Sequence, residues 1–102
     1  MHYYSVKSSD TAAGSNYAND GAAGTNALAA GASASATSDN SVAVGYRAGA
    51  NEGVPSVGFK FGGHTSVGAL SGQSVTGNTN QAFGYNTGNS VVGNSNVATG
   101  TG

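Results

Sequence analysis

The sequence contains no cysteine, no tryptophan and no isoleucine, and it contains a single proline. Without cysteine, no disulfide framework can stabilise the fold. Only 7% of the 102 residues are charged, and the three Lys and Arg are scattered. A nucleic-acid-binding surface needs clustered basic residues, so no nucleic-acid partner is expected. No apolar run is long enough to span a membrane, so we expect no membrane insertion by this part of the chain.

The scarcity of large aliphatic residues excludes an ordinary globular core. The chain contains 18 Gly and is rich in Ala, Ser, Asn and Thr. So little apolar side chain cannot offset the conformational entropy that a compact domain loses on folding. Two classes remain, namely a disordered low-complexity chain and a repeat structure that gains its core by stacking and assembly. The formal net charge of −1 argues against disorder, which usually accompanies a high net charge.

A short alternating unit that ends in glycine recurs along the chain. Its clearest copy is Asn-Ser-Val-Ala-Val-Gly at residues 40–45. A small residue stands two positions before each closing glycine, and the residues one and three positions before it are larger in most units. The closing glycines are Gly31, Gly45, Gly58, Gly68, Gly84 and Gly100, and the larger residues include Val42, Val44, Phe83 and Val97. A period of two places the larger pair on one face of a strand and the small residue on the other.

The spacing of these units predicts a solenoid. Residues 26–39 and 40–53 are successive copies of fourteen residues, and residues 77–84 recur sixteen positions later at 93–100 as G-N-[S/T]-N-x-A-x-G. We expect coils of about fourteen residues, each with two short strands and two turns, with the larger pair of side chains buried. Within 54–76 the spacing slips, which indicates either a shortened coil or a small excursion from the stack.

A single coil of this kind cannot be stable, because ordering its backbone costs more than burying two larger side chains returns. Even a stack of coils would have a thin core of Val, Ala and Gly. We therefore expect several chains to associate and bury a second face. We also expect Asn at the start of a unit to bond within its own turn and to stack on the Asn of the next coil, and glycine to form each corner.

The segment Asn-Ser-Val-Ala-Val-Gly-Tyr-Arg-Ala at residues 40–48 resembles the N-S-V-A-[I/V]-G-x-x-[A/S] repeat of YadA-like heads in trimeric autotransporter adhesins. Residues 3–8, Tyr-Tyr-Ser-Val-Lys-Ser, are similar to the Y-F-H-V-N-S segment that leads into such heads, with Ser5 where His is usual and Lys7 where Asn is usual. The resemblance covers most of residues 2–100 and is closest at 26–53 and 77–100.

This resemblance implies an all-β, left-handed parallel β-roll that assembles as a homotrimer. Residues 1–10 would be a strand or cap leading into the head, and residues 11–102 would be the head repeats, irregular at 54–76. It also implies a place on the bacterial cell surface, at the outer membrane, with the anchor outside this sequence. The implied function is attachment to host cells or extracellular matrix, with autoaggregation in some members and a part in virulence.

No catalytic or metal-binding pattern occurs in the sequence. The histidines His2 and His64 are far apart, the acidic residues are isolated, and there is no G-x-S-x-G motif. We therefore expect no enzyme activity, no metal and no cofactor.

Candidate surface contacts are Tyr46, Arg47, Lys60 and His64, because aromatic residues and Arg dominate binding hot spots. Phe59 and Phe61 could belong to the same exposed patch. The alternative, which we favour, is that these two residues fill the core at the irregular region. Binding by such heads is also expected to use the repeated surface as a whole, so that no single residue decides it.

Two other functions remain open. An ice-binding β-solenoid shares the small residues and short coils, but the regular Thr-x-Thr ladders expected there are absent. A purely structural spacer in a fibre would use the same repeats without a ligand. A disordered glycine-rich linker is disfavoured, because Ala or Ser and Val are placed so regularly before glycine.

Overall fold

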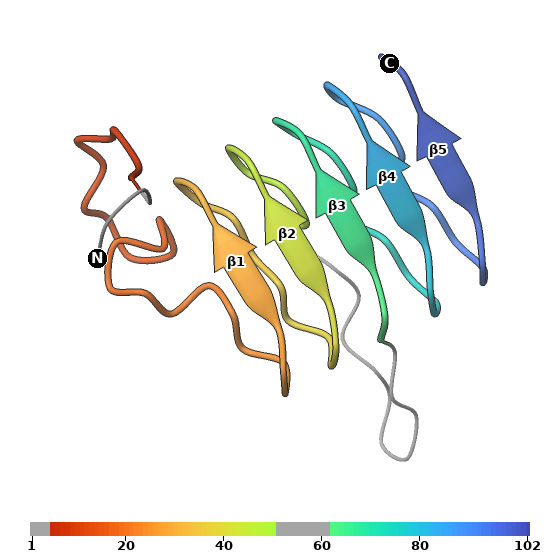
Figure 1. Cartoon of the computed structure of the whole chain (residues 1–102), viewed down its shortest axis with the longest axis horizontal. Helices are drawn as coiled ribbons and strands as arrows, with labels where there is room; N and C mark the ends of the chain where they lie inside the picture. The colour runs from red at the N-terminus through yellow and green to blue at the C-terminus, as the bar shows by residue number, and fades with distance from the viewer. Residues whose placement is uncertain (1–4, 51–61) are drawn as a thin grey trace.

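The computed structural model describes residues 5–50 and 62–102. Five three-residue strands form one sheet in the order β1-β2-β3-β4-β5 (Figure 1). The strands are β1 (Leu28–Ala30), β2 (Val42–Val44), β3 (Thr65–Val67), β4 (Gln81–Phe83) and β5 (Val97–Thr99). Each neighbouring pair is parallel, so the chain must return to the same end of the sheet between strands. The result is an all-β solenoid of about four turns, as the spacing of the units predicted.

The register of the sheet follows the repeated unit. The small residues two positions before each closing glycine lie opposite one another across the sheet. They are Ala29, Ala43, Ser66, Ala82 and Ala98. Each larger residue likewise lies opposite its equivalent in the next coil. The strands and their register were therefore predicted correctly at these five units.

The length of the coils changes along the stack. Asn26 and Asn40, which bond across the first coil boundary, are 14 residues apart. Asn78 and Asn94, which bond across a later boundary, are 16 residues apart. The expected length of about fourteen is therefore right for the first turn, and the later coils are longer. The first of these bonds also confirms the expected Asn-to-Asn contact between coils.

Between β2 and β3 the equivalent positions are 23 residues apart, as for Ser41 and His64. The expected unit at 55–58, with Gly58, lies outside the described residues, and β2 pairs directly with β3. The described part of the range expected to be irregular, residues 62–76, contains β3, which is in register with both of its neighbours.

The return segments were expected to contain a second strand in each coil. In the described chain they contain only isolated bridges, such as Ala22 to Ala36, and residues 46–50 are turns. Ser33 and Arg47 have φ values of 58° and 55°, which interrupt an extended conformation. The segments still bond from coil to coil, for example from Arg47 N to Ala32 O at 3.0 Å.

The interior of the roll is narrow and filled by small side chains. The buried residues of the described chain are Ala34, Ala36, Ala43, Ala48, Val75 and Ala82 among the apolar ones, and Ser15, Ser38, Ser41, His64, Ser66, Ser71, Asn80 and Thr87 among the polar ones. The expectation that the larger pair of each unit fills the coil is wrong. A coil of this length encloses too small a cross-section for them, so the small residue points inward and the larger pair points to the other face of the sheet.

Each corner after a strand needs glycine for two reasons. The closing glycines of the described units have φ between 111° and 129°, a region that other residues occupy only under strain. The corners also stack closely, and a Cβ atom on Gly45 would lie 2.7 Å from the carbonyl carbon of Gly68 in the next coil. The expected role of glycine at the corners is confirmed.

The segment before β1 covers one end of the stack. Residues 5–10, expected to belong to a leading strand or cap, form no strand, and residues 1–4 lie outside the described part. Asn16 Nδ2 donates to the carbonyl oxygens of Ala29 and Gly31, both at 3.3 Å. A side-chain amide therefore satisfies acceptors at the edge of β1 that a further strand would otherwise use.

Candidate functional site

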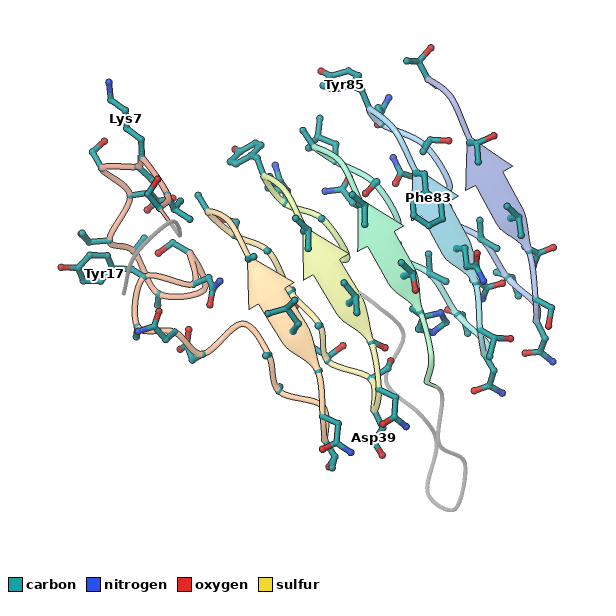
Figure 2. All side chains as sticks on the ribbon, viewed as in Figure 1. Lys7, Tyr17, Asp39, Phe83 and Tyr85 are labelled. Atoms are coloured by element: carbon teal, nitrogen blue, oxygen red, sulfur yellow. The ribbon has the colours of Figure 1, made fainter. Side chains whose placement is uncertain are left out.

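The outer face of the sheet carries the larger side chains of every strand. Its larger apolar members are Leu28, Val42, Val44, Val67, Phe83 and Val97, which we call the outer apolar face. Leu28 is 49% exposed, Phe83 39% and Val97 65%, and the other members are half-buried. Figure 2 shows Phe83 on β4 in this row of side chains. An apolar surface that continues from strand to strand is typical of an interaction site.

The interior of one roll supplies little hydrophobic stabilisation. Among the described residues the buried polar side chains outnumber the buried apolar ones, eight against six, and Val75 is the only buried apolar residue larger than Ala. The larger apolar side chains lie on the outer apolar face instead. Covering that face would therefore bury more apolar area per residue than the interior does.

The corner after β2 brings together two of the four predicted surface contacts. Tyr46 and Arg47 are exposed and line a groove of about 370 Å³. The other lining residues are Gly14, Ser33, Ser35 and Ala50. Tyr85 holds the corresponding corner position after β4 and is also exposed (Figure 2). The predicted contact Lys60 lies outside the described residues, as do Phe59 and Phe61.

His64, the fourth predicted surface contact, is not on the surface. It is 1% exposed, and it stands directly before β3, where strand alternation turns its side chain into the coil. The prediction of a surface contact at His64 is therefore wrong. The repeat pattern could have predicted that His64 is buried. His64, Ser41 and Asn80 each stand four positions before a closing glycine, and all three are buried.

The residues at this position form a column of hydrogen bonds that is buried at Ser41, His64 and Asn80 and ends at the exposed Asn96 of the last coil. His64 N donates to Ser41 Oγ at 3.3 Å, and Asn80 N donates to His64 Nδ1 at 3.3 Å. Asn96 N donates to Asn80 Oδ1 at 3.0 Å. We call Ser41, His64, Asn80 and Asn96 the interior column. In each step the side chain of one coil accepts the backbone N–H of the equivalent residue in the next coil.

Burial makes protonation of the His64 imidazole less favourable. Loss of water around the imidazole lowers the pKa of His64 from its ordinary value of 6.5, and weaker contributions from the backbone of Gly77 and Asn80 act in the opposite direction. Its Nε2 has no hydrogen-bond partner of ordinary geometry among the described residues. The imidazole is therefore a neutral, structural group at neutral pH.

Within 5–50 and 62–102, no three His, Cys, Asp or Glu side chains are grouped closely enough to hold a metal. No helix in these ranges is long and apolar enough to cross a membrane. No family model, no curated protein and no solved structure matches the chain, so an assignment of function rests on the repeat, the roll and its surfaces.

Proposed function

We propose that this chain is a head module of a bacterial trimeric autotransporter adhesin, displayed at the outer membrane, which attaches the cell to host cells or extracellular matrix and promotes autoaggregation. The observation that carries the proposal is the outer apolar face on a parallel roll. The segment that resembles the family's repeat supplies β2 and its corner at Gly45, so the resemblance and the architecture agree at the same residues.

Two further copies of the chain are the partners that suit the outer apolar face. No charged residue occupies an outward position of the five strands. Strands of one sheet lie about 4.8 Å apart. If three such sheets faced one axis, the equivalent side chains of the three chains would be buried against one another at every coil. This homotrimer would supply the apolar burial that the narrow interior of one roll lacks.

The surfaces outside the strands would then meet the host molecule. The groove at Tyr46 and Arg47 is the candidate contact, because an aromatic ring and a guanidinium group there are exposed. The chain itself provides a matched control, since the preceding coil has Ala32 and Ser33 at the same two positions. The double substitution Tyr46→Ala and Arg47→Ser should therefore leave the corner intact.

Binding of the purified wild-type assembly to immobilised extracellular-matrix proteins tests the adhesive function. We expect saturable binding, and a loss of affinity in the double variant if the groove is the contact. Equal binding by the double variant would assign the contact to the repeated surface. A folded assembly that binds neither matrix nor host cells would support a structural spacer, and inhibition of ice growth would support the ice-binding alternative.

A further inference from the structure

The interior column contains one member whose bonding depends on pH. We propose that His64 is an acid-sensitive joint between the coils of β3 and β4, at which protonation of the imidazole breaks the column and loosens the roll. The proposal concerns the stacking of coils within one chain, so it stands whether or not the chain is an adhesin.

His64 links three successive coils. Toward β2, its N–H donates to Ser41 Oγ at 3.3 Å and its carbonyl oxygen accepts Val42 N at 2.8 Å. Toward β4, its Nδ1 accepts Asn80 N at 3.3 Å, and the adjacent Thr65 N donates to Asn80 O at 3.0 Å. A change at this side chain therefore acts directly on the boundary between β3 and β4.

Protonation converts the acceptor in this link into a donor. Because Nδ1 accepts the N–H of Asn80, the hydrogen-bond network assigns the proton of the neutral ring to Nε2. A proton taken from solvent would bind Nδ1 and face the backbone N–H of Asn80. Two donors cannot bond to each other, so the amide of Asn80 would lose its partner inside the roll.

No titratable group in the described surroundings stabilises the resulting charge, and the backbone of Gly77 and Asn80 offsets the cost of burial only in part. Ser41 and Val42 face His64 from the coil of β2, and Gly77 and Asn80 face it from the coil of β4; none of these residues is titratable. The nearest carboxylate along the described chain, that of Asp39, accepts the N–H of Thr25 in the opposite direction, at 2.9 Å. The cavity beside His64 is about 10 Å³, at the lower limit for one water molecule.

The sign of the pH dependence follows from burial. The folded chain holds the pKa of His64 below 6.5, so the unfolded chain binds more protons as the pH falls. The full stability is present above pH ~6.5 and decreases below it until the pH reaches the folded pKa. Carboxylates ordinarily titrate near pH 4, so a window between about pH 7.5 and pH 5 is dominated by histidine.

The chain suggests a control variant that keeps a side-chain acceptor for the N–H of Asn80 but has no titratable group at position 64. In the next step of the interior column, Asn80 accepts the N–H of Asn96 with its amide oxygen. The substitution His64→Asn repeats that arrangement one coil earlier. The other histidine, His2, remains in the variant, so the difference between the two proteins isolates His64.

The test is a series of thermal melts of the full chain, followed by far-UV circular dichroism from about pH 7.5 to about pH 5. We expect the wild-type Tm to fall by about 5 °C or more over this window and the Tm of His64→Asn to change by less than half as much. A wild-type Tm that is constant, or an equal fall in both proteins, would overturn the proposal.

Hydrogen exchange gives a second readout on the wild-type chain alone. The backbone amides of His64 and Asn80 both belong to buried residues of the interior column, and only the acceptor of the Asn80 amide is titratable. Between about pH 7.5 and pH 5, the protection factor of the Asn80 amide should fall at least tenfold relative to that of the His64 amide. Parallel changes at both amides would exclude a joint at His64.

Discussion

At the scale of single residues, the stacked corners set the strictest requirement on the sequence. Gly84 and Gly100 hold the same place in successive units, with φ of 129° and 111°. A Cβ atom on Gly84 would collide with the carbonyl oxygen of Gly100, whereas a Cβ atom on Gly100 would have no atom within 4 Å. The pair therefore separates the cost of backbone strain from the cost of a clash between coils.

We predict that Gly84→Ala lowers the free energy of unfolding by about 3 kcal/mol or more, because strain and a backbone clash add together. Gly100→Ala should lower it by only about 1–2 kcal/mol, because strain acts alone. Urea unfolding followed by circular dichroism measures both. Equal losses in the two variants would mean that the coils do not stack as closely at this corner as described.

At the scale of one strand, the direction of each side chain decides which substitutions the roll tolerates. Ala43 in β2 is fully buried among Ala34, Ala36 and Ala48. Ala30 in β1 lies on the other face of the sheet and is partly exposed. The same substitution at these two positions therefore compares the interior with the outer face.

We predict that Ala43→Leu lowers the free energy of unfolding by about 3 kcal/mol, because the packed interior has no room for three more carbon atoms. Ala30→Leu should lower it by less than Ala43→Leu does, since the added atoms lie outside the packed interior of the coil. The comparison is made by urea unfolding at one protein concentration. A larger loss at position 30 than at position 43 would contradict the assignment of the two faces.

The strands and their register could be predicted from the repeated unit, but the enclosed face could not. Alternation shows that the two faces of a strand differ, and the cross-section of the coil then decides which face is inside. The return segments were predicted less well, because Ser33 and Arg47 adopt positive φ although neither residue type favours it strongly. Of the predicted contacts, Tyr46 and Arg47 are exposed, whereas placing His64 requires the alignment with Ser41 and Asn80.

At the scale of the whole molecule, the central question is what covers the outer apolar face. The interior of one roll buries mainly Ala and polar side chains, so an isolated chain has little to stabilise it. Phe83 is the largest side chain of the outer apolar face and lies on β4, within the ladder rather than at its edge. A charge placed there should separate the chains, because an unpaired charge would be buried in the assembly.

The most direct test is the solution mass of the wild-type chain and of Phe83→Lys, measured by light scattering after size exclusion and paired with a far-UV circular dichroism melt. We predict three times the chain mass of 9.8 kDa and a cooperative β melt for the wild type. For Phe83→Lys we predict the mass of one chain and a lower Tm. A wild-type chain that is monomeric at working concentrations, whether it melts cooperatively or has the spectrum of a random coil, would contradict the account.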